Sequence, residues 1–151
     1  MSGFSISTPI PSVNLHRLFR SSWFRWTAFG LWAGLLWTLS SRTGDLQDLP
    51  DIPWSDKIAH FIYFAAGGFL LTAACVGSGS NPHRPRLILR ITLLIALIGA
   101  LDEYHQSFVP GRSGNDPYDW MADVLGGLSG ALVFRRIRAV LRPPADDSYR
   151  P

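Results

Sequence analysis

The side chains that could do chemistry in this chain lie in three short polar groups, each beside a long apolar segment. Adjacent carboxylates could serve as a general acid and base or bind a cation, a histidine could act as a base, and an arginine could hold a phosphate or a carboxylate. The candidate binding residues are Lys57 and His60 in the first group, Asp102, Glu103 and Gln106 in the second, and Arg112, Asp119 and Asp123 in the third. Within this set we take His60, Asp102 and Glu103 as the candidate catalytic residues.

The spacing within these groups suits one face of a helix, because residues four apart are neighbours on a helix surface. Three pairs have this spacing: Asp56 with His60, Asp102 with Gln106, and Asp119 with Asp123. His105 turns partly away from the second pair. Just before the third pair, Asp116-Pro117 is typical of a helix start, with Asp116 as the N-cap and Pro117 in the first helical position. Ser55 is a similar N-cap candidate for the first group.

Four apolar segments must position these groups, over about residues 26–41, 58–76, 87–106 and 118–136. A membrane-spanning helix needs roughly 17 to 25 predominantly apolar residues. We therefore expect an all-α membrane bundle of four transmembrane helices. A soluble bundle of four buried helices is the alternative, but it would need polar faces at the helical period, and the first two segments have none.

Small residues are expected where such helices approach one another. The chain offers three sets for this role: Gly30 with Gly34, Gly67 with Gly68, and Gly126 with Gly130. Cys75, the one cysteine of the chain, lies within the second segment and is expected to serve in packing. A single cysteine excludes a disulfide bond within the chain.

The placement of basic residues predicts how the four spans are oriented in the membrane. Of the fourteen basic residues, eleven lie before the first span, in the linker between the second and third spans or the first turn of the third, or at and beyond the end of the fourth. The positive-inside rule then predicts that both termini are cytoplasmic and that the three polar groups face the outside of the membrane. Ionisable groups within spans usually face the bundle interior or a water-filled cavity, so we expect one extracytoplasmic pocket.

Length and composition fit a single membrane domain. The chain has 151 residues, and 17% of them are charged, against about 25% in a typical soluble domain. We expect a disordered cytoplasmic arm over 1–22, a four-helix membrane domain over 23–142 and a disordered tail over 143–151. A net charge of +3, widely spread, does not indicate a nucleic-acid partner. The expected partner is the lipid bilayer, and oligomers are left open.

Three motifs carry a resemblance to a known family. They are Asp56-Lys57-x-x-His60, then Asp102-Glu103-x-x-Gln106-x-Phe108-Val109-Pro110-Gly111-Arg112, and finally Asp119-x-x-x-Asp123-x-x-Gly126-x-x-x-Gly130. In this order they resemble the VanZ-like family, small multi-pass bacterial membrane proteins named for a member associated with teicoplanin resistance. The resemblance runs from about residue 40 to 134. It implies a protein of the bacterial inner membrane with a link to the cell envelope and antibiotic resistance. The family often has Asn at the position of Asp123.

Two functions suit a pocket on the outer face. The first is the binding or modulation of an anionic lipid or a lipid-linked cell-envelope precursor, with Lys57, His60 and Arg112 on the head group. The second is a membrane-embedded hydrolase or transferase acting on such a head group, with His60 and Glu103 as acid/base groups and Asp56 orienting the histidine. The chain contains no Gly-x-Ser-x-Gly elbow, His-Glu-x-x-His pair or P-loop.

A purely structural role for the carboxylates is equally open. Asp102 and Glu103 would then form a buried ion pair with Arg112 or Lys57 that locks the helix ends together. We expect no resident cofactor and no His-rich metal site, because His105 is the one other nearby histidine. A Ca²⁺ or Mg²⁺ site is a further alternative. Its oxygen ligands would come from Asp102, Glu103, Asp119 and Asp123.

Overall fold

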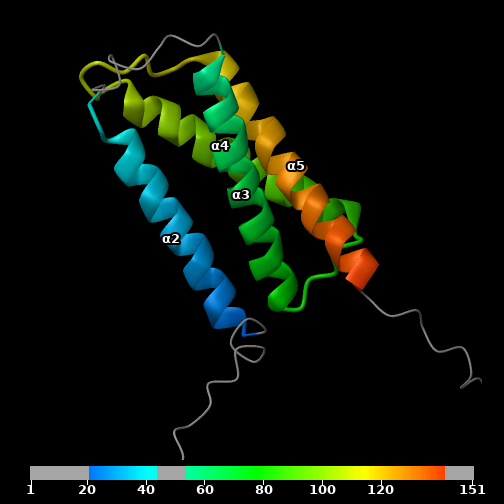
Figure 1. The fold of residues 1–151 in the computed structure, drawn as a ribbon. Helices are drawn as coiled ribbons and strands as arrows, with labels where there is room; N and C mark the ends of the chain where they lie inside the picture. Colours follow the sequence, from blue (N-terminus) through cyan, green and yellow to red (C-terminus); the bar gives the residue numbers. More distant parts are fainter. Residues whose placement is uncertain (1–20, 44–53, 142–151) are drawn as a thin grey trace, which may run out of the picture.

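The computed structural model describes residues 21–43 and 54–141, and this part of the chain contains four helices and no strand. The helices are α2 (Ser22–Ser40), α3 (Ser55–Gly77), α4 (Pro85–Gln106) and α5 (Pro117–Leu141) (Figure 1). The predicted all-α class is therefore confirmed, and the four apolar segments agree with the helices to within a few residues. Most of the predicted arm over 1–22 and the whole tail over 143–151 lie outside the described residues.

Local sequence explains where the helices begin. Ser21 caps α2 by accepting a hydrogen bond from the Phe24 N–H. Asp116 caps α5 as predicted, since its carboxylate accepts from the Tyr118 N–H at 2.8 Å. The expected N-cap at Ser55 is wrong: Ser55 is already helical, and Trp54 precedes it in the left-handed region with φ 69°. An indole cannot accept a capping hydrogen bond, so the first turn of α3 has no side-chain cap.

Helix α3 lies at the centre of the bundle, where it contacts α5 most extensively and also packs against α2 and α4. Its fully buried Phe64 belongs to a core that also contains Trp32, Ile91 and Ile95. A Cβ on Gly68 would overlap the Gly127 carbonyl of α5, so these two helices approach with their backbones in contact.

The glycines of α3 and α5 thus have the packing role predicted for them, and α3 continues without a break through Gly67 and Gly68. The prediction is wrong for α2. Cβ atoms on Gly30 and Gly34 would meet nothing within 4 Å, since this stripe faces away from the other helices.

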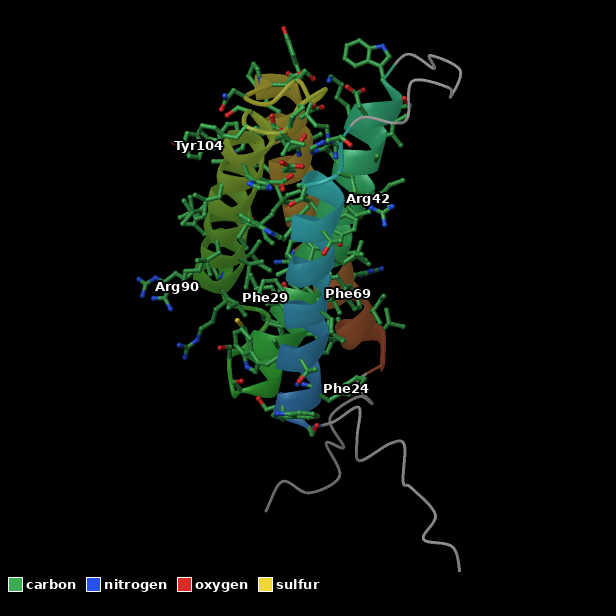
Figure 2. All side chains as sticks on the ribbon, turned by 90° about the vertical axis from the view of Figure 1, so that its left-hand side faces the viewer. Phe24, Phe29, Arg42, Phe69, Arg90 and Tyr104 are labelled. Atoms are coloured by element: carbon green, nitrogen blue, oxygen red, sulfur yellow. The ribbon has the colours of Figure 1, made fainter. Side chains whose placement is uncertain are left out.

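The bundle has two different ends. Helix α2 begins and α5 ends at the same end of the molecule (Figure 1). Figure 2 shows Phe24 near that end, and Arg42 and Tyr104 near the opposite one. The opposite end holds the start of α3, the end of α4, the loop over 107–116 and the start of α5, and we call it the polar end.

Large apolar side chains cover the outside of all four helices. Examples at 50% exposure or more are Leu31 and Leu35 on α2, Ile62 on α3, Leu93 and Leu97 on α4, and Leu125 and Val133 on α5. Among the described helices, α3 has the length and apolar composition to cross a membrane. Helices α2, α4 and α5 do not combine both properties, so the prediction that they also cross a membrane stays a prediction.

Candidate functional site

Three helices bring buried polar side chains together at the polar end. The loop over 107–116 folds back onto the end of α4, where the Asn115 N–H donates to the Glu103 carbonyl at 3.2 Å. A Cβ on Gly114 would overlap the Ser107 backbone, so the loop lies directly against the chain it leaves. Among the buried polar residues of the described chain are Asp102, Glu103, Gln106, Asp119 and Asp123, all from the predicted set.

Lys57 is surrounded by three carboxylates. Its Nζ lies 2.7 Å from Asp56, 3.0 Å from Asp116 and 2.9 Å from Asp119. An ammonium group has three N–H donors, so these carboxylates occupy all of them. The Lys57 ammonium also holds the pKa of Asp116 below its usual value, and the Tyr118 N–H adds to this effect. Lys57 is therefore a counter-charge for acids and has no donor left for an anionic ligand.

His60 and Asp123 form a second cluster, deeper in the bundle. The Nδ1 atom of His60 lies 2.9 Å from Oδ1 of Asp123, whose side chain is 0% exposed. Glu103 lies beside them, and its Oε2 accepts a hydrogen bond from the Asp116 N–H at 2.8 Å. One nitrogen or oxygen atom from each of His60, Glu103 and Asp123 lies within 4.8 Å of the others. Asp123 on α5 therefore orients the His60 ring. The expectation that Asp56, one turn earlier on α3, would do so is wrong, because Asp56 pairs with Lys57.

Two oxygens of this second cluster are unusual. Oε1 of Glu103 and Oδ2 of Asp123 are buried and have no hydrogen-bond partner among the described residues. Burying a carboxylate without compensating hydrogen bonds or charge is costly. Such atoms in an otherwise satisfied interior point to a strained, catalytic or ligand-binding role.

Asp102 belongs to a third arrangement, which is fully hydrogen-bonded. Its Oδ2 accepts from Gln106 Nε2 at 2.8 Å, and its Oδ1 accepts a hydrogen bond from the Ser40 hydroxyl. Ser40 ties the end of α2 to α4 and was not among the predicted site residues. Its only sequence signal is a hydroxyl at the end of an apolar segment, which is too common to single it out.

Arg112 and His105 also contact the end of α2. Nη2 of Arg112 donates to the Leu39 carbonyl at 3.1 Å, and its Nε is buried without a partner among the described residues. The His105 ring stacks on Trp37 with 4.0 Å between ring centroids, and it lies outside the His60 cluster. The prediction that His105 turns away is confirmed.

Several predicted interactions are corrected by this geometry. Among the described residues, Asp102 and Glu103 form no ion pair with Lys57 or Arg112, because Lys57 pairs with other acids and Arg112 binds a carbonyl. The oxygen-only cation set is also not assembled. Asp119 is bound to Lys57, and Asp102 to Ser40 and Gln106.

The fold and this end define a class: a small all-helical protein with an apolar exterior and a cluster of buried charged side chains at one end. A comparison with known families matches residues 3–139 to VanZ/LLP1. The chain belongs to this family, as its motifs indicated. No curated protein and no solved structure matches it.

Proposed function

We propose that this VanZ/LLP1-family chain crosses the bacterial inner membrane four times, with both termini in the cytoplasm and the polar end outside. The exposed apolar side chains on all four helices support this arrangement, because a soluble protein rarely exposes so large an apolar surface. Arg84, Arg86 and Arg90 lie between or near the ends of α3 and α4 that are far from the polar end, as the positive-inside rule requires.

We further propose that the polar end binds the head group of an anionic lipid or a lipid-linked cell-envelope precursor. One observation carries this proposal: the end contains buried polar atoms that the described residues leave without partners. They are two acceptors, on Glu103 and Asp123, and one donor, on Arg112. A head group that combines a phosphate with hydroxyl or amine groups offers the complementary donors and acceptors.

The geometry changes which basic side chain is proposed to bind the anionic part of the head group. Lys57 is assigned to the three acids around it, so Arg112 is the basic side chain proposed for the anionic part of the ligand. His60, Glu103 and Asp123 form the proposed floor of the site. Asp102, Gln106 and Asp119 hold the helix ends in place around it.

The test is a titration of the full-length protein in neutral-lipid nanodiscs with a polyprenyl diphosphate and, separately, with phosphatidylglycerol. We expect saturable binding of one of these probes, weakened about tenfold or more by Arg112→Lys, because a point charge cannot replace a bidentate guanidinium. Arg86→Gln is the matched control, since it removes a basic residue at the far end of the bundle. Equal loss in both variants would mean that binding is a general charge effect and would reject the proposal.

A second function, hydrolysis or group transfer on such a head group, is favoured by the His60–Asp123 pair. A carboxylate that holds a histidine at 2.9 Å fixes its tautomer and orientation, as a general base requires. Glu103 would then be the partner acid/base group. His60→Asn separates the two functions. A variant that still binds its probe but loses product formation supports catalysis, and the absence of turnover in the wild type rejects it.

We also propose a role in teicoplanin resistance, and this part of the proposal rests on family membership alone. Expression of the full chain in a susceptible host should raise the inhibitory concentration of teicoplanin, and Glu103→Gln should abolish the increase at equal protein level. No change with the wild type would remove resistance from the proposal and leave head-group binding to be decided by the titration.

A further inference from the structure

We propose that His60, Glu103 and Asp123 form a binding site for one divalent transition-metal cation such as Zn²⁺ or Mn²⁺. The residues come from three different helices, α3, α4 and α5. Each offers one ligand atom, and these atoms lie within 4.8 Å of one another. The inference deepens the proposed function, because these three residues form the floor of the proposed head-group site, but metal binding there does not require a head group.

The burial of the two carboxylates is the first argument. Glu103 is 4% exposed and Asp123 is 0% exposed, and each has one buried oxygen without a hydrogen-bond partner among the described residues. Two carboxylates placed side by side away from water repel each other and lose their hydration. A cation bound between them would compensate both effects.

The nearby basic side chains do not supply this compensation. Lys57 donates to Asp56, Asp116 and Asp119. Arg112 donates to the Leu39 carbonyl. Within the described chain, His60 is thus the one basic side chain that pairs with either carboxylate, and a neutral imidazole is also a metal ligand.

The backbone makes room for the cluster at Gly99 on α4. A Cβ at this position would lie 2.7 Å from Oδ2 of Asp123, the oxygen that lacks a partner. Any larger residue would push this oxygen out of its place. The absence of a side chain at position 99 therefore preserves the position of one proposed ligand atom.

The donor set selects the kind of cation. One imidazole nitrogen and two carboxylate oxygens suit Zn²⁺ or Mn²⁺ better than Ca²⁺ or Mg²⁺, which prefer oxygen ligands. Metal–ligand bonds of about 2.1 Å in a tetrahedron place the ligand atoms about 3.4 Å apart. Small side-chain rotations would bring the three atoms to this spacing. Three protein ligands would leave a coordination position for water or another ligand.

The test measures metal binding to the full-length protein in detergent, after treatment with a chelator and without added lipid. Equilibrium dialysis with Zn²⁺ or Mn²⁺, followed by elemental analysis, should give one ion per chain. Glu103→Gln and Asp123→Asn should each weaken binding about 100-fold or more, because loss of a hydrogen-bond partner of a ligand already costs about 10–100-fold and these changes remove a ligand itself. Asp56→Asn is the matched control: it removes an exposed carboxylate one turn from His60 and should leave the affinity unchanged.

A glycine pair tests the geometry separately. Gly99→Ala should weaken metal binding at least tenfold, whereas Gly34→Ala, at an open position on α2, should not. The proposal is overturned if the wild type binds no stoichiometric metal. It is equally overturned if Asp56→Asn weakens binding as much as Asp123→Asn does. Because no lipid is present, stoichiometric metal without head-group binding in the nanodisc titration would reject the proposed function and retain the metal site.

Discussion

Glu103 and Asp102 are neighbours in the chain, but their carboxylates have different surroundings. Both oxygens of Asp102 accept hydrogen bonds, from Ser40 and Gln106. Glu103 uses only Oε2, for the Asp116 N–H, and leaves Oε1 without a partner among the described residues. A substitution at Asp102 should therefore mainly lower the stability of the protein, whereas one at Glu103 should mainly weaken ligand binding.

Asp102→Leu should be more destabilising than Glu103→Gln. It keeps a side chain of similar size but removes both acceptors, so the Ser40 hydroxyl and the Gln106 amide lose their hydrogen bonds, at a cost of about 1–3 kcal/mol. Glu103→Gln keeps an acceptor for the Asp116 N–H and removes a buried charge, so metal-free protein should keep its melting temperature or gain a few degrees. Thermal unfolding in detergent measures both. An equal loss at the two positions would support a structural lock in place of a binding site.

Lys57 should be important for stability. Lys57→Met leaves Asp119, which is 5% exposed, close to two other acids without a counter-charge. Breaking a buried pair costs about 3–5 kcal/mol. Because the Lys57 side chain is 20% exposed, we expect a smaller loss, of about 1–3 kcal/mol in the free energy of unfolding. Denaturant unfolding tests this, with Arg90→Gln as the control. Unchanged stability would show that the three acids do not need Lys57.

At the level of the helices, the contact between α3 and α5 fixes the site, because it places His60 opposite Asp123. Gly68→Ala would force a Cβ against the Gly127 carbonyl, and the two backbones would have to separate. We expect a loss of about 1–3 kcal/mol or more. Gly30→Ala on the open face of α2 should cost nothing and, by helix propensity, should stabilise the helix slightly. Equal melting temperatures for the two variants would contradict the close packing.

The sequence predicted the helices well because each signal is local. The long apolar segments predicted the four helices, and the Asp116-Pro117 pair predicted where α5 begins. Trp54 was missed because a left-handed residue without a capping side chain leaves no pattern. The role expected for Gly30 and Gly34 was wrong, since a stripe of small residues does not reveal which helix it faces.

The sequence predicted which residues gather at the site, but it did not predict which of their side chains contact each other. Spacing of four residues places Asp56 and His60 on neighbouring turns of one helix. It cannot tell which residue of α5 faces them, because this depends on how the helices rotate and approach. The structure pairs His60 with Asp123 and leaves Asp56 with Lys57. Ser40 could not have been found for the same reason.

For the whole molecule, the charge distribution makes a prediction about topology. A reporter fused after Pro151 or inserted in the linker over 77–86 should be cytoplasmic, and one inserted near Asp45 should be extracytoplasmic. The positive-inside rule predicts this result because the basic residues concentrate on one side of the four proposed spans. Alkaline phosphatase and green fluorescent protein fusions report the two sides. The opposite pattern would place the polar end in the cytoplasm and exclude an outer-face ligand.

The central claim is that the polar end binds a membrane ligand and is more than a helix lock. Native mass spectrometry of the full-length protein, extracted gently from its own membrane, tests it most directly by comparing wild type with Glu103→Gln. We predict that the wild type retains one polar lipid per chain and that the variant loses it while keeping the same melting temperature. Identical lipid retention in both proteins, or a variant that loses lipid only because it unfolds, would contradict the claim.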